Sequence, residues 1–216
     1  MGVARRGLFI TFEGGEGAGK STQVRLLADW LKAGGRDVIV TREPGGTPAA
    51  ERLRELLLDP AIDLDPMEQV LLFYAARRNH VEKVIRPALA SGCIVLCDRF
   101  ADSTAAYQGA AGGVGAADIA KIARVSLDGF GPDLTLLFDI DPEAGAVRVA
   151  ARGEGTDRFE QASLAFHQRL RAHFLEIARA EPARVRVVDA SAGIDEIAAR
   201  VQALVAERLE TAGAGT

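Results

Sequence analysis

Cysteine is scarce in this sequence, and histidine is nearly so. The 216 residues include two cysteines, Cys93 and Cys97, which stand four residues apart in a strand-like segment. No further cysteine pair is present to complete a zinc site, so we expect reduced core cysteines in a cytoplasmic protein. The three histidines, His80, His167 and His173, fall in helical patterns among charged residues. We expect them at the surface, and their spacing forms no metal site.

Long apolar runs and blocks of like charge are also missing. No segment is long enough to cross a bilayer, and Arg5 and Arg6 are not followed by the apolar stretch of a signal peptide. The net charge is −4, so we expect neither a nucleic-acid-binding surface nor a membrane partner. The composition is 48% hydrophobic and 26% charged, which is typical of a globular protein with a core. We expect residues 1–216 to form a single domain.

A glycine-rich loop lies between an apolar run, 8–12, and a helical pattern, 22–31. It matches the phosphate-binding pattern G-x-x-x-x-G-K-[ST] and comprises Gly14, Gly15, Glu16, Gly17, Ala18, Gly19, Lys20, Ser21 and Thr22. Glycines let several backbone N–H groups converge on one anion, and the start of the helix adds a positive dipole end. Lys20 is expected to contact the β- and γ-phosphates, and Ser21 to supply a hydroxyl to Mg²⁺. We predict a site for a nucleoside triphosphate with Mg²⁺.

Strand and helix patterns alternate along the chain. Strand-like segments occupy 8–13, 37–41, 94–97, 134–138 and 184–188, and helical segments occupy 22–33, 48–58, 68–90, 118–127, 143–151, 160–180 and 194–209. This alternation predicts an α/β fold of the phosphate-loop NTPase type, with a five-stranded parallel sheet between two layers of helices. Pro87 is expected to kink the helix over 68–90. The glycine-rich stretch 103–115 is expected to be part helix and part loop.

Charged residues stand where several of these strands end, and ligands of parallel sheets bind at that edge. Arg42 and Arg99 each follow a strand, and guanidinium forks suit the dianionic phosphate of an acceptor. Asp98 has two interpretations, as an orienter of Mg²⁺ or as a partner of Arg99. Glu13 ends the first strand and is expected to hold Arg42 or Arg99.

Five groups of residues, in order along the chain, resemble the thymidylate kinase family. They are 12–22, the Thr-Arg-Glu-Pro-Gly-Gly-Thr turn at 41–47, Phe-Tyr-Ala-Ala-Arg at 73–77, the Asp-Arg-Phe to Tyr-Gln-Gly segment at 98–109, and 152–160. The resemblance spans residues 8 to about 175. It implies transfer of the γ-phosphate of ATP to deoxythymidine monophosphate (dTMP), giving the diphosphate (dTDP), with Mg²⁺. It also implies a homodimer that forms through the helix at 68–90.

The resemblance further implies how the acceptor is held. Phe73 would stack on thymine and Arg77 would bond a base carbonyl, and their spacing of four places both on one helix face. Thr104 and Gln108 would face the base edge, with Tyr107 beneath the deoxyribose. The acceptor phosphate would lie near the two strand-end arginines, Arg42 and Arg99.

Glu16 is unusual because a carboxylate in a phosphate loop repels a triphosphate. The resemblance implies that Glu16 meets the 3′-hydroxyl of the acceptor sugar, so that the missing positive charge comes from elsewhere. A lid at about 148–160 can supply it, and we favour Arg152, then Arg148, as the catalytic arginine beside Lys20 and Arg99. Two features depart from many relatives: the stretch 109–115 has no arginine, and the lid is slightly longer.

Two alternatives remain at this point. Another nucleoside monophosphate kinase, for guanylate or adenylate, would keep the same phosphate loop, although the residues at 73, 77, 107 and 108 favour thymine. A GTP-binding switch would carry an Asn-Lys-x-Asp motif. The only asparagine, Asn79, is followed by His80, so that motif is absent.

Overall fold

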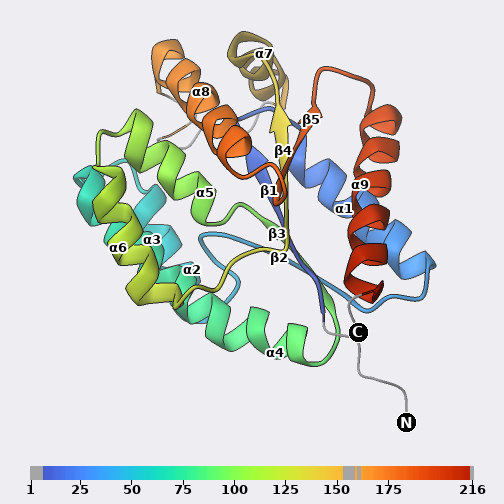
Figure 1. Ribbon diagram of the computed structural model, residues 1–216. Helices are drawn as coiled ribbons and strands as arrows, with labels where there is room; N and C mark the ends of the chain where they lie inside the picture. The colour runs from blue at the N-terminus through green and yellow to red at the C-terminus, as the bar shows by residue number, and fades with distance from the viewer. Residues whose placement is uncertain (1–6, 153–158, 160–161, 215–216) are drawn as a thin grey trace.

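The centre of the protein is a twisted sheet of five parallel strands (Figure 1). The computed structural model describes residues 7–152, 159 and 162–214. The strands are β1 (Phe9–Gly14), β2 (Val38–Arg42), β3 (Ile94–Asp98), β4 (Leu134–Asp139) and β5 (Val185–Asp189). Their order in the sheet is β2-β3-β1-β4-β5, and every adjacent pair is parallel. The predicted five-stranded parallel sheet is confirmed.

Helices connect successive strands. They are α1 (Lys20–Ala33), α2 (Pro48–Leu58), α3 (Pro66–His80), the π-helix η1 (Val81–Ile85), α4 (Arg86–Ala90), α5 (Ala101–Thr104), the π-helix η2 (Ala105–Ala111), α6 (Ala116–Leu127), α7 (Pro142–Arg152), α8 (Leu164–Ala180) and α9 (Ile194–Ala214). The predicted helices agree with these to within a few residues. The stretch expected to be part helix and part loop is helical as far as Ala111.

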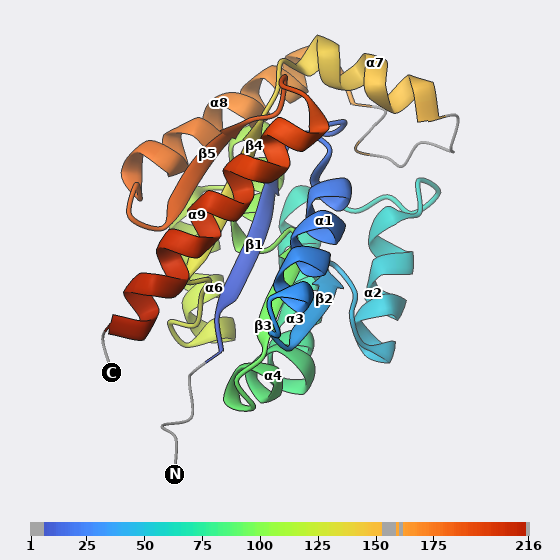
Figure 2. The ribbon, with the colours of Figure 1, turned by 90° about the vertical axis from the view of Figure 1, so that its right-hand side faces the viewer.

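The helices form a layer on each face of the sheet, as Figure 2 shows from the side. On one face, α1 and α9 pack against the strands around Phe12, Leu27 and Leu136. On the other face, α3, α4 and α6 form a core around Phe9 and Tyr74 with the strands. A third cluster joins α8 to η2 and the β4–β5 side of the sheet. These layers explain why the strands read as continuous apolar runs, since a parallel sheet is buried on both faces.

The predicted long helix over 68–90 is divided by a π-helical turn. Its N-terminus is fixed by Asp65, which forms a capping box with Glu68. The η1 turn directly precedes α4, whose first turn holds Pro87. Proline has no N–H and crowds the preceding helical turn, so a wider turn at this point is the local response to Pro87.

The strand order places the phosphate loop in the middle of the sheet. β1 lies between β3 and β4, so the loop after Gly14 opens at the centre of the carboxyl edge. The chain then continues to β2 and β3 on one side and later to β4 and β5 on the other. Ligands bind at such a switch point in open α/β sheets.

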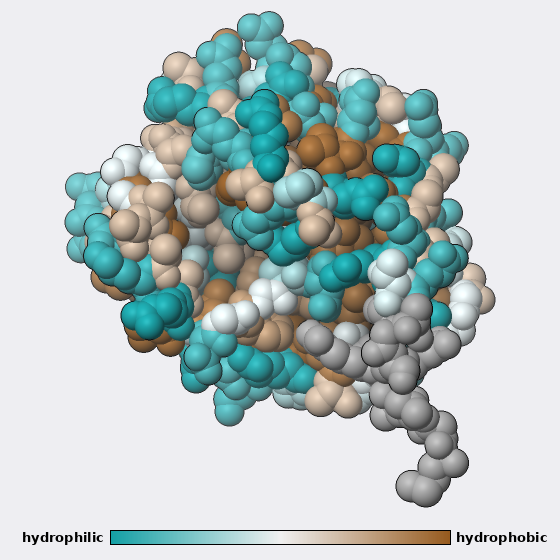
Figure 3. All heavy atoms as spheres, in the orientation of Figure 1, coloured by the Kyte–Doolittle hydropathy of each residue, from teal (hydrophilic) through white to brown (hydrophobic). Residues whose placement is uncertain are grey.

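Polar side chains are interspersed among apolar ones over the face drawn in Figure 3. The exposed large apolar residues include Leu71 on α3 and Val125 on α6, which are 53% and 77% exposed. Within the described residues, no helix combines the length and apolar character that a bilayer crossing requires.

Candidate active site

The phosphate loop curls around the side chain of Lys20. The ammonium donates hydrogen bonds to the carbonyl oxygens of Gly14, at 3.1 Å, and Gly15, at 2.7 Å. Burial, and then the nearby charge of Arg99, lowers the pKa of Lys20 to about 8. Gly17 has a φ of 70°, and a Cβ there would collide with the carbonyl oxygen of Gly145 at the start of α7. Glycine is therefore required where the loop passes beneath α7.

Glu16 forms an ion pair with Arg99, which follows β3. Arg99 Nη2 donates to Glu16 Oε1 at 2.7 Å, and the hydroxyl of Tyr107 donates to the same oxygen at 2.6 Å. Burial disfavours the charged form of Glu16, but Arg99 and Lys20 outweigh it and hold its pKa at about 2. The guanidinium of Arg99 also lies over the ring of Tyr107, 5.0 Å from its centre. The acidic residue of the loop thus brings Arg99 and Tyr107 to the loop.

Glu13 holds the backbone that follows Arg99. Its carboxylate accepts hydrogen bonds from the N–H of Phe100, at 2.7 Å, and from the hydroxyl of Ser103. Glu13 thus supports Arg99 indirectly, as expected for one of its two candidate partners, because Arg99 Nη1 donates to the same Ser103 hydroxyl at 3.2 Å. Burial, followed by the charge of Asp102, raises the pKa of Glu13 to about 7. Arg99 itself has a φ of 68°, and this anchor keeps it in that strained conformation.

Ser21 and Asp98 lie together at the ends of α1 and β3. The hydroxyl of Ser21 donates to Asp98 Oδ2 at 2.9 Å, whereas Arg99 pairs with Glu16. The other carboxylate oxygen of Asp98, Oδ1, is buried without a hydrogen-bond partner. A hydroxyl and a carboxylate with a spare oxygen are ligands that Mg²⁺ prefers, so this pair fits the metal. Of the two interpretations of Asp98, the geometry favours the one that involves Mg²⁺.

Arg77 is buried and fixed by three hydrogen-bond acceptors. Its Nε donates to Glu43 Oε2 at 2.6 Å, and its Nη2 donates to the carbonyl of Phe100 and the hydroxyl of Thr104. The side chains of Arg77 and Glu43 are 2% and 3% exposed. Burial opposes the charge on Arg77, but the carboxylate of Glu43 outweighs it and raises the pKa. Arg77 Nη1 alone remains without a partner in the structure.

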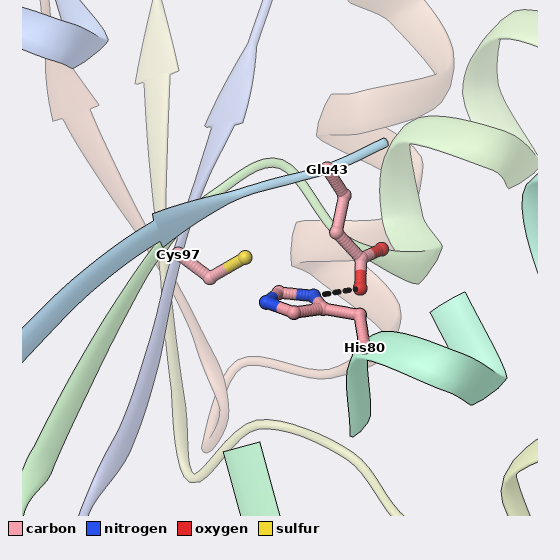
Figure 4. Close-up of side chains that lie close together, drawn as sticks. All are labelled: Glu43, His80 and Cys97. Atoms are coloured by element: carbon pink, nitrogen blue, oxygen red, sulfur yellow. Dashed lines mark hydrogen bonds and ion pairs between the residues drawn. The ribbon is translucent and has the colours of Figure 1, made fainter. Parts of the chain in front are cut away.

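His80 is fully buried, so the prediction that it lies at the surface is wrong. Its Nδ1 lies 2.9 Å from Glu43 Oε1 (Figure 4). Its Nε2 lies 2.7 Å from the hydroxyl of Thr41. A carboxylate only accepts, so Nδ1 donates to Glu43, and Nε2 shares a hydrogen bond with Thr41. Gly46 packs directly over the ring and has no room for a Cβ. The 42–47 turn therefore packs on the ring of His80. The other two histidines, His167 and His173, are partly exposed.

Cys97 completes this buried group on β3. Glu43, His80 and Cys97 could geometrically share one ion, because their ligand atoms lie within 4.8 Å of one another. However, the thiol of Cys97 donates to the carbonyl of Arg99, and burial raises its pKa well above the ordinary value. A protonated thiol is not a metal ligand. We interpret the group as a hydrogen-bonded anchor. Cys93 and Cys97 are both unpaired, as expected.

A cavity of about 840 Å³ runs along the carboxyl edge of the sheet, within the size range of nucleotide-sized ligand sites. It brings together most of the site residues predicted from sequence: Glu16, Gly17, Ala18, Gly19, Lys20, Ser21, Thr22, Arg42, Phe73, Arg77, Asp98, Arg99, Thr104, Tyr107, Gln108 and Arg148. Gly14 and Gly15, at the start of the loop, do not line the cavity, but their carbonyl oxygens accept hydrogen bonds from Lys20. Arg42 is half exposed and pairs with Glu51.

The two ends of the cavity belong to opposite sides of the sheet. Phe73 and Arg77 lie on α3, which packs on the β2–β3 side, and Gln108 lies on η2, which contacts both α3 and α8. Arg148 lies on the β5 side and donates to the carbonyl of Ala190 at 2.9 Å. Beside it, the turn between β5 and α9 lines the cavity with Ala192 and Gly193, and the first turn of α9 lines it with Ile194 and Ile197. The phosphate loop separates the two ends.

Sequence reasoning missed several residues that line or support the cavity. They include Gln23, Glu43, Ser103, Phe159 and the 192–194 turn. Phe159 lies 5.5 Å from Tyr107, ring centre to ring centre, and belongs to a motif that was recognised without a role for this residue. Glu43 could have been predicted from the sequence, because it lies beside Arg42 at the end of a strand. For the 192–194 turn, the only indication in the sequence was its position after the fifth strand.

Arg152 is the last residue of α7, where the described part of the lid ends. Apart from Phe159, the remainder of the predicted lid, 153–158 and 160 with Arg158, lies outside the described residues. The structure therefore leaves the choice of Arg152 as the catalytic arginine a prediction.

Known proteins resemble this chain over nearly its whole length. A family model described as thymidylate kinase matches residues 12–201. A protein of Caulobacter vibrioides named thymidylate kinase is 58% identical over 205 residues, which cover 94% of this chain and 98% of that protein. One from Deinococcus radiodurans with the same name is 50% identical, with the same coverage. A crystal structure of thymidylate kinase from Ehrlichia chaffeensis has a TM-score of 0.75 and 37% identity, covering 93% of this chain and 98% of that one.

The buried pair Glu43–Arg77 yields a prediction about stability. Glu43→Gln leaves the charge of Arg77 buried and unpaired, so we expect a loss of about 3–5 kcal/mol in the free energy of unfolding. Glu51→Gln breaks the exposed pair with Arg42 and is the matched control, with an expected loss below about 1 kcal/mol. Urea unfolding of both variants measures the difference; equal losses would contradict the role assigned to the buried pair.

Glu13 yields a prediction about pH. Its folded-state pKa of about 7 lies above the unfolded value, so the folded state binds its proton more tightly, and this contribution to stability is lost as pH rises towards 7. The Glu13→Gln variant has no titrating group at this position and does not lose this contribution. Its free energy of unfolding, relative to that of the wild type, should therefore rise by roughly 2–3 kcal/mol between pH 5.5 and pH 8. The difference for Glu51→Gln should stay constant, and a constant difference for Glu13→Gln would refute the assignment.

Proposed function

This chain belongs to the thymidylate kinase family, and we propose that its cavity is the site where the γ-phosphoryl group of ATP passes to dTMP. The protein is an ATP-dependent dTMP kinase that forms dTDP. In the reaction, an oxygen of the acceptor phosphate bonds to the γ-phosphorus, and the bond from that phosphorus to the β,γ-bridging oxygen breaks. The products are ADP and dTDP. The observation that carries the site assignment is one cavity with a phosphate loop between two distinct ends.

The donor triphosphate is proposed to occupy the loop from Gly14 to Thr22. Backbone N–H groups and the start of α1 bind the phosphates, and Lys20 turns from its carbonyl acceptors to the β- and γ-oxygens. Its positive charge then opposes the negative charge that builds up on the bridging oxygen. Arg148 and the 192–194 turn are placed to hold the donor base, because they line the end beyond the loop.

Mg²⁺ is proposed to bind beside Ser21 and Asp98. The unpartnered Asp98 Oδ1 supports this assignment. When bound, the ion supplies positive charge that neutralises phosphate oxygens. The protein's own contribution is to hold the hydroxyl of Ser21 and the carboxylate of Asp98 together at the start of α1.

The acceptor nucleotide is proposed to lie at the other end. Arg42 and Arg99 bind its phosphate as bidentate donors. Phe73 stacks on the base, Arg77, Thr104 and Gln108 read its edge, and Tyr107 packs beneath the sugar. Glu16 accepts a hydrogen bond from the 3′-hydroxyl while it keeps Arg99 and Tyr107 in place. The unpartnered groups Arg77 Nη1 and Gln108 Oε1 support a base at this position.

Two further proposals concern the whole protein. We propose one phosphate-loop kinase domain over residues 1–216, with the segment at about 148–160 as a lid. We also propose a homodimer, which would cover Leu71 and Val125 on the neighbouring helices α3 and α6. A cytoplasmic location is supported by two unpaired cysteines.

The acceptor assignment is tested by comparing monophosphates with ATP as donor. We expect kcat/KM for dTMP to exceed the values for guanosine and adenosine monophosphates by at least about 10³-fold, because a purine leaves the buried polar groups unpaired. Coupled ADP release measures the rates. A purine preference would favour the alternative nucleoside monophosphate kinase, and nucleotide binding without turnover would favour the GTP-switch alternative.

The lid assignment is tested with two arginines of α7. Arg152→Ala should lower kcat by roughly 10²–10³-fold with little change in the KM for dTMP, since a lid charge acts in the transition state. Arg148→Ala is the comparison: it should mainly raise the KM for ATP, and a larger fall in kcat than in Arg152→Ala would favour Arg148 as the catalytic arginine. Initial rates with each substrate varied separate the two effects. If Arg152→Ala changes only the KM for dTMP, the catalytic assignment is wrong.

A further inference from the structure

Gln69 lies behind the base end of the cavity and does not line it. It belongs to α3 and is 9% exposed. Its side-chain Nε2 donates to the main-chain carbonyl of Leu64 at 2.9 Å. Its Oε1 accepts from Gln108 Nε2 at 3.1 Å. Gln69 therefore connects a fixed backbone oxygen to a residue that does line the cavity.

This chain of hydrogen bonds has only one possible direction. A carbonyl oxygen cannot donate, so the amide nitrogen of Gln69 must face Leu64. Its oxygen then faces Gln108, and Gln108 must turn its own nitrogen towards Gln69. The side-chain oxygen of Gln108, Oε1, is then the atom that points away from Gln69, and it is buried without a hydrogen-bond partner. Because the Leu64 carbonyl sets this order, the orientation does not depend on how the amide atoms were assigned.

Arg77 presents the opposite polarity in the same cavity. Its guanidinium is held by Glu43, Phe100 and Thr104, and only Nη1 is left unpartnered. The base end thus offers one fixed acceptor and one fixed donor. Thymine presents a donor at N3–H next to an acceptor at O4. Cytosine presents an acceptor at N3 and a donor at its 4-amino group, which reverses both.

We propose that Gln69 is a positioning residue that sets the acceptor polarity of Gln108 and thereby selects the imide edge of thymine over the cytosine edge. This inference rests on the proposed base site. A buried acceptor that meets another acceptor is left unpaired, which is the most costly mismatch for a polar site. Without Gln69, the amide of Gln108 can turn over, present its nitrogen and accommodate the N3 of cytosine.

The test compares dTMP with 5-methyl-2′-deoxycytidine monophosphate, which differs from dTMP only at N3 and C4. In Gln69→Met the ratio of the two kcat/KM values should fall about tenfold, and the loss for dTMP should lie in KM. Gln69→Glu should hold the ratio within about threefold, because either form of the carboxyl still accepts from Gln108. If Gln69→Met does not fold, Gln69→Leu takes its place, and thermal unfolding monitors all variants.

Three outcomes overturn the inference. The first is an equal fall in the ratio for Gln69→Met and Gln69→Glu, which would indicate a merely structural role. The second is an unchanged ratio in Gln69→Met. The third is a further fall in the ratio when Gln69→Met is added to Gln108→Leu. An effect of Gln69 that acts through Gln108 must vanish in a protein that already lacks the Gln108 side chain. Failure of the proposed base site is distinguishable, because Gln108→Leu would then leave kcat/KM for dTMP unchanged.

Discussion

The active site depends on the ion pair between Arg99 and Glu16. It joins the segment after β3 to the loop after β1, which are neighbours in the sheet. Glu16 lies between two cations, Arg99 and Lys20, and its carboxylate stays ionised because their charges outweigh the cost of burial. Without this carboxylate, two buried positive groups would face each other across the loop. The acidic residue that looks unfavourable for a triphosphate therefore organises the site in which both substrates meet.

A second layer of buried carboxylates holds the functional side chains in place. Glu13 binds the backbone after Arg99, and Glu43 binds Arg77 and His80. Each buried carboxylate has its acceptor capacity used by the protein, so it fixes a neighbour and remains unavailable to ligands. Unpartnered side-chain atoms on Gln23, Arg77, Asp98 and Gln108 line the cavity, whereas another, Nε of Arg208, lies outside its lining.

The architecture also separates the two halves of the reaction. The strand order β2-β3-β1-β4-β5 puts the phosphate loop at the centre, Arg42 at the end of β2, and Arg148 towards β5. The loop has a carboxylate where a cation would assist catalysis, which is why we propose that an arginine of the lid supplies the missing charge. A phosphate loop alone binds a triphosphate, whereas this arrangement can place an acceptor phosphate in line with it.

The sequence by itself determined the parallel sheet, the phosphate loop and the arginines at strand ends, because these follow from short spacings and from the common edge of parallel strands. The family motifs also placed Phe73, Arg77 and Gln108 together. Only the tertiary structure decided that His80 is buried, that Asp98 faces Ser21, and that Gln108 donates a hydrogen bond to Gln69. A polar residue on a helix has the same local pattern whether it faces water or a turn packed over it. The partner comes from a distant segment, and only the packed fold brings the two together.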